Sequence, residues 1–227
     1  PRGRISEVYG LDSSGKSCLA LAAVGDAQKK GYKAAYIDVE NTLDTETAEM
    51  MGVTVDDLFV SQPPDGHTAL EILLALIKTG EFGIIVVDSV AALTPKQEAE
   101  TEDFGSSFIG VVARMMSQCM RKIIQPAHEN NVAVLFLNQQ RVDIQSAGYG
   151  DGLTTSGGKA LKYGASVRVE LKKLTQVKEG DDVVGHNVSA KVVKNKLAAT
   201  FKTYSYVITY GQNNVYLDEL VNLGIEY

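Results

Sequence analysis

Cysteine is scarce in this sequence: only Cys18 and Cys119 are present, too few to build a disulfide framework. Both fall in helix-like segments where a small apolar residue would serve equally well. Long apolar runs are missing too, and no stretch approaches the length that crosses a bilayer. We therefore expect a soluble protein in a reducing compartment.

Linkers rich in Pro, Gly or Ser and internal repeats are also absent. With 227 residues and 44% hydrophobic content the chain can bury a full core, so we expect one domain over residues 1–227. The chain starts with Pro1 rather than Met and opens directly into a strand-like segment. We expect it to be a fragment of a longer protein.

An excess of positive charge is absent as well, because the formal net charge is −6, which argues against general affinity for nucleic acid. The basic residues nevertheless crowd one stretch. They are Lys159, Lys162, Arg168, Lys172, Lys173, Lys178, Lys191, Lys194, Lys196 and Lys202. Solvated strand and loop lysines are the favoured interpretation, and a local basic face stays open.

What the sequence does contain is a glycine-rich motif. Residues 10–17 read GLDSSGKS, match the pattern GxxxxGKS, and lie between strand-like residues 5–9 and helix-like residues 16–30. In this setting the glycines let backbone N–H groups wrap a phosphate tail, Lys16 reaches the terminal phosphates and Ser17 ligates the accompanying magnesium. The motif predicts nucleotide binding without fixing the task that the nucleotide serves.

An unbroken apolar run, FGIIVVD at residues 82–88, is typical of a buried parallel strand. We expect Asp88 at the carboxyl end of this strand, beside the phosphate loop. There its carboxylate would hold the magnesium ion directly or through water.

Short apolar runs alternate with amphipathic stretches, which is the order of a parallel α/β fold. Strands are expected at residues 5–9, 33–39, 58–61, 82–88 and 132–138, and helices at residues 16–30, 43–51, 68–79, 109–129 and, more briefly, 218–223. Residues 166–174, 187–194 and 203–210 are β-rich and predict antiparallel strands added at the C-terminal sheet edge. The predicted fold class is α/β, with a mainly parallel central sheet flanked by helices.

Two segments fit no regular element: residues 98–107, which are acidic and polar, and residues 140–158, which are rich in Gly, Ser and Thr. Both follow strands whose carboxyl ends are expected near the nucleotide. They are therefore well placed to contact a second ligand.

Five segments, taken in order, closely resemble the bacterial RecA recombinases: GLDSSGKS (10–17), YIDVENTLD (36–44), VDSVAALTPK (87–96), ARMMSQ (113–118) and KVVKNK (191–196). The resemblance implies a RecA-type P-loop NTPase core that binds ATP and Mg²⁺, forms filaments on single-stranded DNA and exchanges strands with double-stranded DNA. It also implies a protein of the bacterial cytoplasm, with an organelle of bacterial origin as the less favoured location, and an N-terminal helix and C-terminal domain that lie outside this chain.

The resemblance also assigns catalytic roles. Glu40 is similar to the carboxylate that orients the attacking water, whereas the residues alone leave Asp38 and Glu40 equal. Gln139 resembles the family's γ-phosphate sensor, which signals to the loop behind it. Lys194 and Lys196 resemble the pair that reaches into the ATP site of the neighbouring subunit.

At the base, Asp44 resembles an adenine contact, and Thr47 stands where the family commonly has a stacking Tyr, so we expect weaker ATP affinity. Tyr210-Gly211 resembles an adenine contact made from the adjacent protomer. The residues implied at the cofactor are Gly10, Asp12, Ser13, Ser14, Gly15, Lys16, Ser17, Cys18, Asp44, Thr47, Tyr210 and Gly211, and those implied at the metal are Ser17 and Asp88.

Residues 98–107 and 140–158 are similar to the family's two DNA-binding loops. The residues implied at DNA are Ile109, Arg114, Arg141, Tyr149, Gly157, Gly158 and Lys159. The loops also depart from the family, because Asp143 replaces an expected basic residue and Leu153 an expected acid. Tyr163 replaces a Phe at the position that relays the nucleotide state between subunits.

Two other functions stay open at this point. One is a RecA-fold ATPase with a different task, such as a helicase motor or a signalling ATPase, and the other is a nucleotide-binding structural or partner-binding module. The lysine pair at positions 194 and 196 and the two loops favour the recombinase. The acidic first loop and the missing adenine stack keep the module open.

Overall fold

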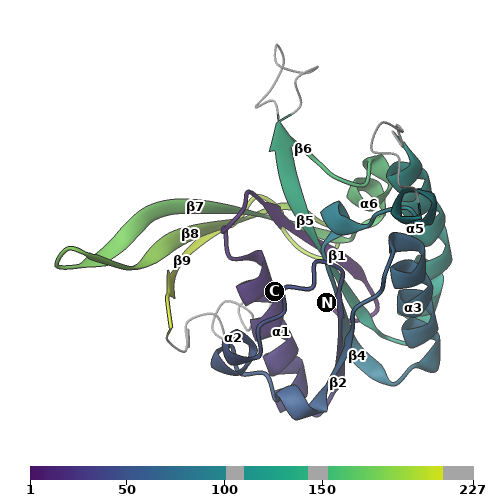
Figure 1. The fold of residues 1–227 in the computed structure, drawn as a ribbon, viewed down its shortest axis with the longest axis horizontal. Helices are drawn as coiled ribbons and strands as arrows, with labels where there is room; N and C mark the ends of the chain where they lie inside the picture. The colour runs from purple at the N-terminus through teal and green to yellow at the C-terminus, as the bar shows by residue number, and fades with distance from the viewer. Residues whose placement is uncertain (101–109, 143–152, 212–227) are drawn as a thin grey trace.

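The computed structural model describes residues 1–100, 110–142 and 153–211 (Figure 1). Its helices and strands are β1 (Ile5–Gly10), α1 (Lys16–Lys29), β2 (Lys33–Asp38), α2 (Thr45–Met50), β3 (Leu58–Ser61), α3 (Gly66–Thr79), β4 (Phe82–Asp88), α4 (Lys96–Ala99), α5 (Val111–Glu129), β5 (Ala133–Val142), β6 (Leu153–Thr155), α6 (Lys159–Gly164), β7 (Val167–Glu179), β8 (Asp182–Asn195) and β9 (Thr203–Thr209). Within these ranges, no helix combines the length and the apolar character that a membrane crossing requires.

One twisted sheet organises the molecule. Its strand order is β3-β2-β4-β5-β1-β7-β8-β9, and β6 pairs with the end of β5. In this order the strands β3, β2, β4, β5, β1 and β7 are mutually parallel, whereas β8 and β9 continue the sheet in antiparallel register. The predicted fold class is confirmed, including the antiparallel strands at the C-terminal edge.

Alternating residues of the central strands bury opposite faces of the sheet. In β2, Ala34 and Tyr36 join the cluster under α1 and α2, whereas Ala35 and Ile37 join the cluster under α3 and α5. Figure 1 shows these two helical layers on either side of the sheet. Burying each large side chain contributes about 1.5–3 kcal/mol, so the two faces together fix the strand register.

Two helices begin at capping residues that the apolar pattern did not mark. The Asp65 carboxylate accepts the N–H of Thr68 at 2.9 Å and starts α3 at Gly66, two residues before the predicted boundary of 68–79. Asp44 caps α2 in the same way, so that helix begins at Thr45 rather than at residue 43. A cap lies just outside the apolar stripe, and the stripe alone therefore misses it.

Both segments predicted to lack regular structure contain some. Residues 96–99 form α4, so the irregular start at residue 98 is wrong for its first two residues. In the second segment, Gln140, Arg141 and Val142 extend β5 and pair antiparallel with β6. These residues gain backbone hydrogen bonds from a partner strand, which composition alone cannot reveal. Ile109, Tyr149 and the short helix expected at residues 218–223 lie outside the described ranges.

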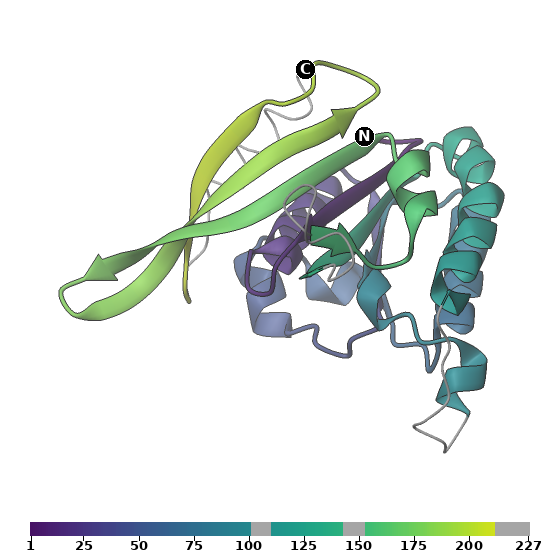
Figure 2. The same cartoon turned by 90° about the horizontal axis from the view of Figure 1, so that it is seen from above.

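A long β7–β8 hairpin extends away from the helical layers (Figure 2). The two strands are 13 and 14 residues long and turn at Gly180, whose φ is +63°. The predicted strands at residues 166–174 and 187–194 are therefore too short. The outer half of β7 is mostly exposed, so no buried face imposes an apolar alternation there.

Candidate active site

The phosphate-loop motif connects β1 to α1 at the carboxyl edge of the parallel strands. A Cβ at Gly10 would lie 2.4 Å from the backbone oxygen of Leu171, and one at Gly15 would lie 2.3 Å from Cδ1 of Ile208. Gly15 also has a φ of +89°. The motif's two glycines are thus required by the close approach of β7 and β9 as well as by the turn.

Lys16 opens α1, a 14-residue helix with no acidic side chain in its first turn. Its Nζ donates to the backbone oxygens of Gly10 at 3.3 Å and Leu11 at 2.9 Å. Burial lowers the pKa of Lys16, and the nearby carboxylates of the site oppose that shift. The free N–H groups of the first helical turn and this ammonium group together form a cradle for an anion. Asp12, Ser13, Ser14 and Cys18 belong to the same loop and first turn.

Asp88 ends β4 and is almost fully buried beside this cradle. Its Oδ2 accepts a hydrogen bond from the hydroxyl of Tyr36 at 2.6 Å and another from Ser17 at 3.0 Å. Burial raises the pKa of Asp88, while these two hydrogen bonds oppose the shift. A hydroxyl and a carboxylate in contact are hard oxygen ligands of the kind that Mg²⁺ prefers, so Ser17 and Asp88 fit the predicted metal.

The structure separates the two carboxylates that the residues alone left equal. Asp38 is fully buried and accepts the N–H groups of Thr42 and Leu43, each at 3.1 Å, and the Nε2 of Gln62 at 3.0 Å. Those bonds shape the loop that follows β2. Glu40 is partly exposed, unlike Asp38. The Asp38 carboxylate is thus engaged by the loop that follows β2, whereas Glu40 is the more exposed of the two.

Glu40 meets side chains from two other strand ends. Its Oε1 accepts a short hydrogen bond from the hydroxyl of Ser89, which follows β4, and one from Nε2 of Gln139 in β5 at 3.4 Å. Its charge also reaches Lys16. A cation, a carboxylate and an amide thus gather at one edge of the sheet, where they can hold a phosphate chain and orient a water molecule against it.

The residues predicted at adenine are found in two separate places. Asp44 Oδ2 accepts both the N–H and the hydroxyl of Thr47, at 2.9 and 2.6 Å, and these bonds lower the pKa of Asp44. Tyr210 follows β9, where its hydroxyl lies 3.0 Å from Nδ1 of His186, and Gly211 has a φ of +66°. In the described part of the chain, no hydrogen bond joins Tyr210 or Gly211 to Asp44.

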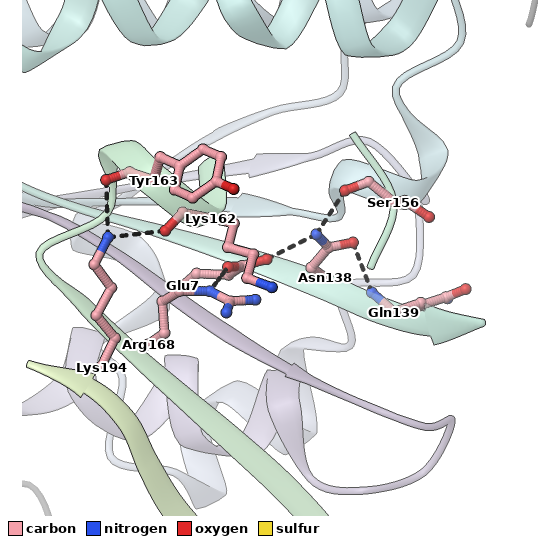
Figure 3. A network of polar contacts seen from close by, with 8 residues as sticks. All are labelled: Glu7, Asn138, Gln139, Ser156, Lys162, Tyr163, Arg168 and Lys194. Carbon is pink, nitrogen blue, oxygen red and sulfur yellow. Dashed lines mark hydrogen bonds and ion pairs between the residues drawn. The ribbon is translucent and has the colours of Figure 1, made fainter. Parts of the chain in front are cut away.

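Lys194 lies at the end of β8 and contacts its own subunit's α6. Its Nζ donates to the backbone oxygens of Lys162 and Tyr163, each at 2.8 Å (Figure 3). Burial and then the neighbouring charge of Lys196 lower the pKa of Lys194. The ammonium group thus caps the last turn of α6, next to the exposed ring of Tyr163.

The predicted DNA residues that the structure describes lie at the starts of two helices and at the end of β5. Arg114 is exposed in the first turn of α5, and Lys159 is exposed at the start of α6. The turn between β6 and α6 holds Gly157 and Gly158, with φ of +81° and +72°, and a Cβ at Gly158 would lie 2.8 Å from that of Ala113. The start of α5 and the turn into α6 are therefore side by side. Arg141 is exposed on β5.

Sequence reasoning missed a buried polar network behind this edge. Arg168 forms an ion pair with Glu7, and Glu7 also accepts from the amide of Asn138 (Figure 3). Arg168 was counted among the basic residues of a solvated or binding face, and its burial removes it from both. The available signal was a charged residue inside each apolar strand, at positions 7 and 168.

Comparison with known proteins gives consistent results. A family model described as the RecA N-terminal domain matches residues 1–214. The chain is 46% identical over 226 residues to Protein RecA of Sulfurovum sp. and 48% identical to Protein RecA of Acinetobacter baumannii. These matches cover 100% of this chain but only 65% and 64% of those relatives.

One solved structure is described as the crystal structure of the RadB recombinase. It is similar with a TM-score of 0.63 and covers 92% of this chain and 88% of that one. Because the two sequences are only 23% identical, this likeness supports the fold alone.

Proposed function

Since the chain belongs to the RecA family, we propose that it is the ATPase core of a recombinase that assembles on single-stranded DNA and exchanges strands in recombinational repair. The observation that supports this proposal most is the meeting of Lys16, Glu40 and Gln139 at the carboxyl edge of the parallel strands. The single sheet of the described residues is consistent with one ATPase core over residues 1–227.

In the proposed reaction, the loop N–H groups and Lys16 hold the phosphates of ATP. Glu40 orients the attacking water toward the γ-phosphate, and its contact with Ser89 fixes the carboxylate. Gln139 donates its amide to the γ-phosphate. A magnesium ion held by Ser17 and Asp88 would neutralise charge on the phosphates.

DNA is proposed to bind where the two loops return to the fold. Arg114, Arg141 and Lys159 are exposed cations at that side, and the turn at Gly157 and Gly158 allows close approach of a phosphate to backbone N–H groups. A neighbouring protomer would supply Lys194, Lys196 and the Tyr210-Gly211 contact, so ATP would lie between subunits of a filament.

The proposal is tested by an oligonucleotide titration with the variant Gln139→Ala. The parent is expected to bind labelled single-stranded DNA more tightly with AMP-PNP and Mg²⁺ than without, whereas Gln139→Ala binds the nucleotide but does not tighten on DNA. Fluorescence anisotropy at several salt concentrations measures both affinity and the number of phosphate contacts. Gln28→Ala, which removes an amide from a surface contact with Thr54, is the matched control.

Equal tightening in Gln139→Ala and the parent would contradict the role of Gln139. A parent that hydrolyses ATP without any nucleotide effect on DNA would instead be an ATPase with another task. A parent that binds ATP without either property would be a nucleotide-binding module.

Lys194→Ala is expected to slow ATP hydrolysis in assembled filaments and to leave hydrolysis by dilute protein unchanged, because the cation acts on a neighbour's nucleotide. The effect is smaller than the loss of Glu40, since Lys196 keeps one positive charge nearby. Turnover measured against protein concentration checks this in a protein of the relatives' length. Lys191→Ala, an exposed lysine of the same strand, is the control. A loss of activity that is independent of concentration argues against a role between subunits.

A further inference from the structure

Three polar side chains are buried side by side in adjacent central strands. Glu7 of β1, Asn138 of β5 and Arg168 of β7 are 1%, 0% and 6% exposed. Buried charges are unfavourable unless they are paired and hydrogen-bonded, and apolar residues of the same volume would pack there at least as well. The presence of an ion pair at this position calls for a role beyond packing.

The contacts of the cluster fix the orientation of one amide group. Glu7 accepts Nε of Arg168 on Oε2 and the Nδ2 of Asn138 on Oε1, the latter at 2.8 Å (Figure 3). The Arg168 guanidinium also lies over the ring of Tyr9, 4.6 Å from its centroid. With Oε1 of Glu7 held in this way, Nδ2 of Asn138 has a fixed acceptor on one side.

The same amide joins two parts of the candidate active site. Nδ2 of Asn138 donates to the backbone oxygen of Ser156 at 3.0 Å, and Oδ1 accepts the N–H of Gln139 at 2.9 Å. Ser156 directly precedes the glycine turn into α6. Asn138 is therefore bonded both to the backbone of the proposed γ-phosphate sensor and to the segment that leads into α6.

The helix that follows is held at its other end as well. The last turn of α6 gives the backbone oxygens of Lys162 and Tyr163 to the ammonium group of Lys194. A displacement of the Gln139 backbone would thus shift Asn138 and, through Ser156, the start of α6. A shift of α6 would in turn move the backbone oxygens that bind Lys194 at its other end. This route runs from Asn138 in β5 to Ser156 in the turn that leads into α6.

We propose that Asn138, oriented by the buried Glu7–Arg168 pair, is a positioning residue that transmits nucleotide occupancy at Gln139 to α6. The inference rests on the proposed function only in that Gln139 contacts the γ-phosphate. Asn138 itself touches neither nucleotide nor DNA in this scheme. Its loss should break the coupling and leave nucleotide binding intact.

The test measures amide hydrogen exchange in α6 with and without AMP-PNP and Mg²⁺. In the parent, the nucleotide is expected to slow exchange at Lys159–Gly164. In Asn138→Ala the nucleotide affinity is unchanged, but its effect on α6 falls at least about fivefold, the lower end of typical coupling between sites. Asn187→Ala is the matched control, because it removes an amide that bonds Thr175 across the exposed hairpin.

A second pair of variants keeps the test decisive if Asn138→Ala does not fold. Glu7→Leu with Arg168→Met removes both charges together and also the acceptor for Asn138, so the coupling should be lost. Glu7→Gln with Arg168→Met also removes both charges but keeps an oxygen for the amide, so the coupling should return. A merely structural role predicts no such rescue.

The outcomes separate the inference from the proposed function. A parent that does not bind AMP-PNP overturns both. A parent that binds AMP-PNP without any response in α6, or an Asn138→Ala variant that keeps the full response, overturns the inference alone. Equal coupling in the two double variants also overturns it.

Discussion

Lys16→Ala is expected to remove most of the affinity for ATP. The ammonium group is partly buried over the loop, where it is held by two backbone oxygens, and in the proposed function it binds the phosphates. Truncating one partner of a buried charge pair costs about 2–5 kcal/mol, and each 1.4 kcal/mol is about tenfold in Kd. The Kd should therefore rise between about thirtyfold and several thousandfold, as measured by fluorescence of a labelled nucleotide.

Lys30→Ala is the matched control for this experiment. Lys30 follows the other end of α1 and forms a surface ion pair with Asp26 at 2.9 Å. Exposed pairs of this kind contribute at most about 1 kcal/mol to stability, so the control should bind ATP as the parent does. If Lys16→Ala binds ATP as tightly as Lys30→Ala, the phosphate-loop assignment is wrong.

Glu40→Gln should leave ATP binding nearly intact and slow hydrolysis by at least roughly a hundredfold, the scale expected when a group that orients the attacking water is lost. The amide of Gln keeps an oxygen for the hydroxyl of Ser89, so the local structure is retained. Single-turnover hydrolysis at saturating ATP separates this effect from binding.

Asp38→Asn provides the comparison, because the two carboxylates are close in sequence and have different partners. Asp38 accepts two backbone N–H groups and one side-chain amide in a fully buried position. Its substitution should lower the melting temperature, since an imperfectly paired buried group costs about 1–3 kcal/mol. Normal turnover in Glu40→Gln, together with lost turnover in a folded Asp38→Asn, would make Asp38 the carboxylate that acts on water.

The parts of the fold that could be predicted from sequence are those where a buried face requires apolar residues at regular spacing. The run at residues 82–88 has apolar neighbours on both faces, and β4 is found at the same residues. The outer half of β7 is mostly exposed, so its polar residues carry no such pattern. Hydrogen bonding to the partner strand, which a sequence does not display, is what makes those residues a strand.

In the candidate site, too, some residues could be recognised from sequence and others could not. The glycines, Lys16 and Ser17 are recognisable because the loop needs those residue types at fixed spacing. Asp38 and Glu40 have similar chemistry at similar positions, and only the hydrogen bonds around them tell the two apart. Arg168 resembles its basic neighbours in composition, and its role depends on Glu7, which is 161 residues away.

The position of β1 in the sheet has a consequence for synthesis of the protein. This first strand lies between β5 and β7, whose residues begin at Ala133 and Val167, and the fit of Gly15 against Ile208 also needs β9. A chain emerging from the ribosome therefore carries the phosphate loop long before the strands that support it. Bound nucleotide stabilises only a folded site, so it cannot assist the early part of translation. A product truncated before Val167 lacks the two strands, β7 and β9, against which Gly10 and Gly15 pack.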